Sequence, residues 1–157
     1  MIKSIEGNFD DPEVNELLTK HFIELRAASP EGSAHVLDIP GLKVSSIKFW
    51  SLWKNEKLLG CGALKFLENN HGEFKSIRVH DDFRKRNNGI KVIEHLIDQA
   101  KKLNIKRVSL ETGAGYFFYP ARKLFKNCNF EPCKPFAHYK DDPNSIYLTK
   151  LINNDSN

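Results

Sequence analysis

The spacing of apolar residues changes from two to about 3.6 near residue 87, and this change most constrains the fold. In 47–53, Ile47, Phe49, Ser51 and Trp53 alternate with Lys48, Trp50 and Leu52, and two more apolar segments, over 57–67 and 73–79, follow across short polar turns. Such segments, with Asn and Gly in the turns between them, predict an antiparallel strand meander. From 87 to 103 the apolar residues share one helical face: Ile90, Ile93, Leu96, Ile97, Ala100 and Leu103. The chain therefore packs a helix against a sheet.

Start and stop signals elsewhere give the remaining elements. Asp11 and Pro12 mark a helix start, as N-cap and first helical residue, after a short strand over 2–5. Further on we expect a loop or short helix up to Gly41, a strand over 107–110, a helix over 117–126 with Pro120 in its first turn, and strands over 130–136 and 145–151. The order β-α-β-β-β-α-β-α-β-β predicts an α/β (α+β) fold, a single domain over 1–157, with helices on both faces of the sheet.

Composition excludes several classes of protein. Of 157 residues 40% are hydrophobic and 28% charged, which excludes a disordered or collagen-like chain. No apolar run is long enough to cross a bilayer and the N-terminus has no apolar signal core, so we expect a cytoplasmic protein with no membrane partner. The three cysteines form no C-x-x-C pair and no ligand set has metal spacing, so we expect free thiols and no metal.

Positive charge gathers in the second half of the chain. Residues 1–80 hold ten Lys and Arg against eleven Asp and Glu, whereas residues 81–157 hold fourteen against nine. The densest cluster is Arg84, Lys85 and Arg86, followed by Lys91. A local excess beside a neutral half indicates an anion site, and it argues against a nucleic-acid groove.

Residues 76–90 carry the chemistry of that anion site. A strand runs into a turn of basic and small polar residues, and the turn opens directly onto the amphipathic helix. Unpaired N–H groups and the positive end of the dipole at such a helix start suit a phosphate. The alternative is an Asn-capped helix with a solvated basic collar. The spacing is not that of a P-loop.

This segment resembles the acetyl-CoA motif of the GNAT superfamily of N-acetyltransferases, Q/R-x-x-G-x-G/A after a strand. Arg84, Asn87 and Gly89 stand at its three defining positions. Where the family has A-x-x-L-Y and then G-F, this chain reads A-R-K-L-F over 121–125 and N-F over 129–130. The chain is most similar to the small bacterial YsnE-type acetyltransferases. The segments that match this subgroup are 29–31, 49–51, 60–65, 109–113 and 142–145.

The resemblance implies a GNAT fold, with a mixed, mostly antiparallel central sheet, and acetyl-CoA as co-substrate. It implies transfer of the acetyl group to a primary amine of a small molecule or a peptide by direct attack. In the family the fourth strand separates from the fifth, which makes the Val79 amide a candidate oxyanion donor. The implied co-substrate residues are Ile77, Arg78, Val79, Arg84, Lys85, Arg86, Asn87, Asn88, Gly89 and Ile90. Those implied for the acceptor are Ser29, Glu31, His35 and Glu111.

Glu73 is the candidate general base, because several members of the family carry a base glutamate at the start of this strand. Simple alternation puts Glu73, Lys75, Ile77 and Val79 on one face, near the thioester. Glu111 is the second candidate base. The alternative for Glu73 is an exposed hairpin glutamate beside Gly72.

Two positions depart from the family pattern. Asn87 replaces a motif glycine, although asparagine tolerates left-handed backbone angles. Phe125 replaces the tyrosine that many relatives use as general acid toward the leaving thiolate. These departures keep a second function open, a GNAT-fold module that binds CoA or acyl-CoA with weak catalysis. A basic RNA-associated protein is a third, less favoured reading. A homodimer stays open, because the sequence does not fix the oligomeric state.

Overall fold

The computed structural model describes residues 1–84 and 86–152 and contains a seven-stranded sheet in the order β1-β2-β3-β4-β5-β7-β6. All neighbouring strands run antiparallel except β4 and β5, which run parallel. The strands are β1 (Ile2–Glu6), β2 (Ile47–Lys54), β3 (Lys57–Phe66), β4 (His71–Val79), β5 (Arg107–Gly113), β6 (Glu131–Pro132) and β7 (Ser145–Leu151). The predicted element order and the mixed, mostly antiparallel sheet are confirmed.

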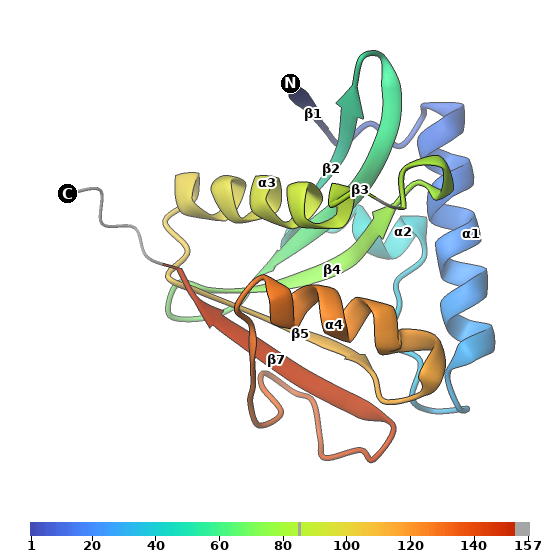
Figure 1. Ribbon diagram of the computed structural model, residues 1–157. Helices are drawn as coiled ribbons and strands as arrows, with labels where there is room; N and C mark the ends of the chain where they lie inside the picture. Colours follow the sequence, from blue (N-terminus) through green and yellow to red (C-terminus); the bar gives the residue numbers. More distant parts are fainter. Residues whose placement is uncertain (85, 153–157) are drawn as a thin grey trace.

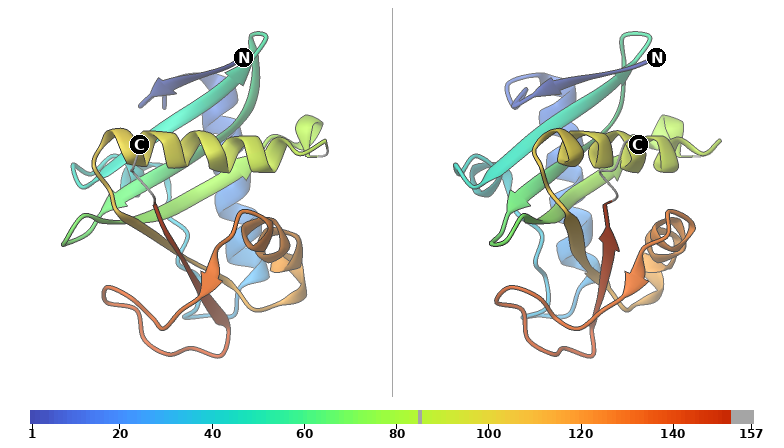
Figure 2. Two further views of the ribbon diagram at one scale, coloured as in Figure 1. Left: turned by 60° about the vertical axis from the view of Figure 1, so that its left-hand side comes forward. Right: turned by 90° about the vertical axis from the view of Figure 1, so that its left-hand side faces the viewer.

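Helices cover both faces of this sheet. They are α1 (Pro12–Ala28), α2 (Ile39–Leu42), α3 (Asn88–Lys102) and α4 (Tyr119–Asn127), with 3₁₀ turns at Asp81–Phe83 and Tyr116–Phe118. Figures 1 and 2 show α3 and α4 on one face and α1 on the other. Helix α1 begins where the sequence predicts, because the Asp11 carboxylate accepts hydrogen bonds from the amides of Glu13 and Val14.

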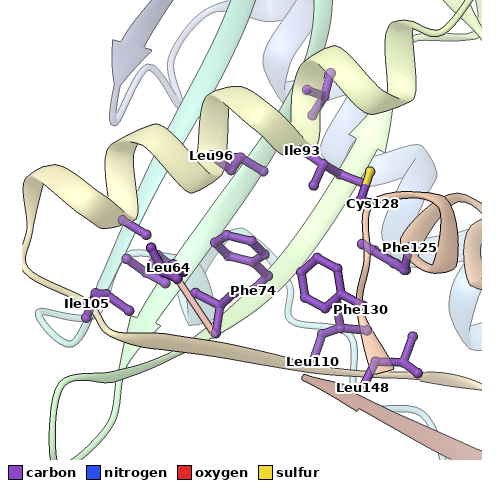
Figure 3. Packing of buried hydrophobic residues seen from close by; sticks show 14 of the residues in the cluster. Leu64, Phe74, Ile93, Leu96, Ile105, Leu110, Phe125, Cys128, Phe130 and Leu148 are labelled. Atoms are coloured by element: carbon purple, nitrogen blue, oxygen red, sulfur yellow. The ribbon is translucent and has the colours of Figure 1, made fainter. Parts of the chain in front are cut away.

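A separate apolar cluster lies on each face. On the α3 and α4 face, Ile93 and Leu96 pack over Phe74, while Phe125 and Phe130 fill the space beside them (Figure 3). The smaller cluster joins α1 and α2 to β2 and β3 and consists of Val14, Leu17, Leu18, Leu42, Ile47, Phe49, Leu58, Cys61 and Ala63. Burial of this kind is the main stabilisation of such a layered fold.

Two element predictions need correction. The strand expected over 130–136 is only Glu131–Pro132, because Pro132 and Pro135 have no N–H to donate to a ladder. The helix expected from 117 begins at Tyr119, after a 3₁₀ turn. Within the described part of the chain, no helix has the length and apolar character needed to span a membrane.

Candidate active site

The two parallel strands at the centre of the sheet separate part of the way along. Pairing between β4 and β5 joins His71 to Arg107, Gly72 to Val108 and Glu73 to Ser109, with no further bridge between the described residues of these strands. Beyond that point β4 runs on to Val79 and β5 to Gly113, and Figure 1 shows them diverging. Glu73 therefore stands at the fork from which the cleft between the strands opens.

A bulge in β4 changes which residues share a face. Lys75 pairs with Ala63 and Arg78 with Cys61, so Ser76 and Ile77 together lie opposite Gly62 alone. Ser76 takes a left-handed backbone, with φ of 53°. Such a two-against-one arrangement is a β-bulge, which redirects the residues that follow it.

The expectation that Glu73, Lys75, Ile77 and Val79 share one face is therefore wrong. Ile77 and Val79 pack on the α3 side of the sheet, against the cluster that contains Phe74. Glu73 and Lys75 lie on the α1 side, because Lys75 pairs with Ala63 of the α1 cluster. The bulge thus directs Glu73 and Val79 to opposite faces of the sheet.

A cleft of about 570 Å³ runs along the fork. That volume lies in the range typical of small-molecule sites. The predicted site residues that line it are Ser29, His35, Glu73, Ile77, Arg78, Val79, Arg84, Asn87, Asn88, Gly89, Ile90 and Glu111. Of the described residues predicted for the site, Glu31 and Arg86 do not line it. The prediction for Lys85 falls outside the described residues.

One end of the cleft is the start of α3. Arg86 and Asn87 both take left-handed backbones, with φ of 65° and 62°. Asn87 occupies the N-cap position, as that alternative expects, but its side chain makes no capping hydrogen bond. Instead, Asn88 Nδ2 donates to the Phe83 carbonyl at 2.9 Å. The first-turn amides of α3, together with the helix dipole and Arg84, make this end attractive to a phosphate group.

The Val79 amide faces the unpaired edge of β4. His80 N donates to the Leu59 carbonyl of β3 at 2.8 Å. Successive N–H groups of a strand point to opposite edges, so the Val79 N–H points toward β5, where β4 has no partner strand. A free amide in this place suits an oxyanion.

Glu73 is the most buried charged residue of the site. It is 1% exposed, so the alternative of an exposed hairpin glutamate is wrong. Its Oε2 accepts hydrogen bonds from the Tyr139 hydroxyl at 2.5 Å and from Lys75 Nζ at 3.2 Å. Its Oε1 is buried and has no hydrogen-bond partner among the described residues. One carboxylate oxygen is thus held in place while the other has its lone pairs free.

Glu111 lies on β5 across the fork from Glu73. Its Oε2 accepts a hydrogen bond from the Ser145 hydroxyl at 2.7 Å. Burial raises the pKa of Glu111 above its ordinary value, with a smaller contribution of the same sign from the Glu73 carboxylate, while Ser145, His35 and Lys75 oppose the rise. The two carboxylates are therefore close enough to interact electrostatically.

The Arg78 side chain does not face the α3 end of the cleft. It is buried on the α1 side, where it pairs with Glu24 at 2.9 Å and Asp81 at 3.4 Å. Burial, with a contribution from Arg78, lowers the pKa of His21 on α1 to about 4. This network ties α1 to the end of β4, and any contact of residue 78 with a co-substrate would be through its backbone.

Two residues that complete the Glu73 environment were not predicted as site residues. Tyr139 lies in the loop of residues 133–144 between β6 and β7, which the sequence marks only as a polar turn. Its contact with Glu73 spans 66 positions, and no local pattern indicates such a contact. Lys75 is two residues from Glu73, and residues with that spacing on a strand share a face. This spacing is the one sequence signal for the contact between them.

Comparison with known proteins defines the class. Residues 12–130 match the model of the acetyltransferase (GNAT) family. The chain belongs to this family. It is an N-acetyltransferase, and its co-substrate is an acyl-CoA. Within the described residues, no cluster of three or more His, Cys, Asp or Glu side chains could hold a metal ion.

The similar proteins cover nearly the whole chain. The uncharacterized N-acetyltransferase YsnE of Bacillus subtilis is 41% identical over 140 residues, 89% of this chain and 93% of that protein. The uncharacterized N-acetyltransferase YedL of Escherichia coli is 36% identical, covering 90% and 89%. An acetyltransferase of Bacillus subtilis, solved in complex with CoA, shares the fold with a TM-score of 0.67 at 16% identity, covering 96% of this chain and 99% of that one.

Proposed function

We propose that this enzyme transfers an acetyl group from acetyl-CoA to a primary amine of a small molecule or a peptide, by direct attack of the amine. The observation that carries the proposal is the buried Glu73 carboxylate at the fork of β4 and β5: Glu73 lines the cleft, and its Oε1 has no hydrogen-bond partner among the described residues. A primary amine arrives as an ammonium ion and must lose a proton before it can attack. Glu73 Oε1 is the acceptor for that proton.

The fork and the start of α3 suit acetyl-CoA. Arg84, the amides of residues 87–90 and the dipole of α3 would hold its pyrophosphate. The unpaired edges of β4 and β5 would hold its pantetheine arm. When bound, acetyl-CoA supplies a thioester whose carbonyl carbon accepts the amine nitrogen.

The chain then supplies two groups to the reaction. Glu73 Oε1, on the α1 side of the sheet, takes the proton of the ammonium. The Val79 amide donates to the carbonyl oxygen as negative charge develops on it. Ser29 and His35, which line the same cleft, would help to position the acceptor, and Glu111 would contribute a second negative charge near the ammonium.

Phe125 favours one alternative, a module that binds an acyl-CoA with weak catalysis. Its ring is buried against Phe130 at 5.4 Å between centroids, and it offers no hydroxyl to protonate a leaving thiolate. In the proposed reaction the proton for the thiolate therefore comes from water or from Glu73, and no tyrosine acts as general acid.

Calorimetry with acetyl-CoA, followed by thiol release with a panel of primary amines and peptides, separates the two functions. The proposed enzyme binds acetyl-CoA and releases CoA at a rate that saturates with at least one amine. Binding of acetyl-CoA without amine-dependent release would identify a binding module.

A further inference from the structure

We propose that Tyr139 is a positioning residue for Glu73: its hydroxyl, together with Lys75, fixes Oε2 so that Oε1 alone faces the acceptor. The inference rests on the proposed role of Glu73 as base and adds the residues that orient it. Three polar atoms form a closed triangle. Tyr139 Oη lies 2.5 Å from Glu73 Oε2, Lys75 Nζ lies 3.2 Å from Glu73 Oε2, and Lys75 Nζ lies 3.2 Å from Tyr139 Oη.

Tyr139 acts in this triangle as a donor. Burial raises the pKa of its phenol above the ordinary value, and the Glu73 carboxylate raises it further. The hydroxyl therefore keeps its proton and donates a hydrogen bond to Glu73 Oε2. A short hydrogen bond to a carboxylate is of the charge-assisted kind and fixes geometry more firmly than a neutral one.

The loop that carries Tyr139 is tied down on both sides. Ser33, in the loop after α1, donates to Asp142 Oδ2 at 2.6 Å, and the Tyr147 hydroxyl donates to the Lys140 carbonyl at 2.8 Å. The His35 ring lies edge-on to the Tyr139 ring with centroids 5.1 Å apart. Segments before β2 and after β6 thus hold the phenol over Glu73, so its position is part of the fold.

The consequence for Glu73 concerns which oxygen is available. With two donors on Oε2, the carboxylate cannot rotate to exchange its oxygens without breaking both bonds. Oε1, which has no partner among the described residues, is then held in one position beside the cleft that Glu73 lines. Holding a base in one geometry before the acceptor binds removes a reorganisation step from the reaction.

Tyr139→Phe tests the proposal, because it removes one hydroxyl and keeps the ring that contacts His35. The matched control is Tyr116→Phe, which removes the hydroxyl of an exposed tyrosine that does not line the cleft. The assay is thiol release from acetyl-CoA, with water as acceptor and then with the most active amine of the panel. We expect kcat of Tyr139→Phe to fall about tenfold or more, with KM for acetyl-CoA within about twofold, and Tyr116→Phe to stay within about twofold of wild type.

The pH profile separates positioning from a merely structural role. The titratable groups that face Glu73 are Lys75, Glu111, His71 and Tyr139, and of these only Tyr139 changes in the variant. Loss of a donor to the charged carboxylate should move the acidic limb of kcat/KM to higher pH by about one unit in Tyr139→Phe. In Tyr116→Phe the limb should not move.

The double variant Glu73→Gln/Tyr139→Phe distinguishes failure of this inference from failure of the proposed function. If Tyr139 acts through Glu73, the double variant is no slower than Glu73→Gln alone. Additive losses, or an unchanged Tyr139→Phe beside a slow Glu73→Gln, would overturn the role of Tyr139 and leave Glu73 as the base. A Glu73→Gln enzyme with wild-type turnover would overturn both.

An experiment without turnover tests the contact itself. Absorbance titration at alkaline pH counts phenolates among the four tyrosines. Since the Glu73 charge helps to raise the pKa of Tyr139, Glu73→Gln should ionise one tyrosine more readily than wild type. The same comparison in a Tyr139→Phe background should show no such difference. Superimposable curves for wild type and Glu73→Gln would show that the contact is absent in solution.

Discussion

Glu73 pairs with Ser109 at the last bridge between β4 and β5, and the two strands separate from that pair onward. A charged side chain that is 1% exposed is thereby placed where the sheet opens, among the residues that line the cleft. The bulge at Ser76 then turns the rest of β4, so that Val79, further along the same strand, presents its amide to the same cleft. The proposed base and the proposed amide donor are thus arranged by backbone geometry.

Asn87→Gly is expected to keep the fold and to bind acetyl-CoA more tightly. Residue 87 has φ of 62°, a region that glycine adopts without steric cost, and the Asn87 side chain makes no capping bond. Removing that side chain opens the phosphate end, so calorimetry should show Kd for acetyl-CoA lower by about two- to fivefold. Asn87→Ala is the control, since alanine in this conformation costs about 1 kcal/mol of stability. Weaker binding by Asn87→Gly would instead mean that the Asn87 side chain contacts the co-substrate.

Gly89→Val is expected to weaken acetyl-CoA binding through Leu124. A Cβ at residue 89 would lie 2.7 Å from Leu124 Cδ2, so the larger side chain must displace Leu124 at the junction of α3 and α4. We expect Kd for acetyl-CoA to rise about tenfold in a folded variant. Adding Leu124→Ala should restore part of the affinity. A double variant as weak as Gly89→Val would show that valine obstructs the phosphate directly, and unchanged affinity in Gly89→Val would contradict this placement of the site.

His21 should make stability depend on pH between about 6.5 and 4. The unfolded chain binds a proton on this histidine near pH 6.5, whereas burial and Arg78 hold the pKa in the folded chain to about 4. The unfolded state therefore binds more protons in this window, and stability falls as pH falls, by up to about 1.4 kcal/mol per pH unit from this group. Urea unfolding at pH 7, 6 and 5 should show a shallower dependence for His21→Leu than for wild type. The exposed His138, replaced by Gln, is the control, and equal slopes for wild type and His21→Leu would contradict the account.

Most of the fold follows from local signals. Apolar spacing separates strands 47–53 and 57–67 from the helix after residue 87, and the start of α1 follows from Asp11 and Pro12 alone. These signals act within one element and need no knowledge of its neighbours. The strand expected over 130–136 is shorter than its apolar residues indicate, because two prolines interrupt the segment.

The phosphate end of the site could also be predicted from local signals, whereas the rest of the site could not. The basic turn and the start of α3 are contiguous in the sequence, so their pattern is readable. The bulge at Ser76 is a property of the pairing between β3 and β4, which no single strand reveals. The contact of Tyr139 with Glu73 joins a loop to a strand 66 positions earlier in the chain, and only the folded structure brings these residues together.

The turnover of Glu73→Gln, measured as thiol release across pH beside Glu111→Gln, tests the central claim most directly. Glutamine keeps the shape of the side chain and cannot accept the ammonium proton. The account predicts that kcat of Glu73→Gln falls on the order of 100-fold or more and that the acidic limb of its profile disappears. Glu111→Gln should keep that limb and lose less than about tenfold. Wild-type turnover in a folded Glu73→Gln enzyme would contradict the account.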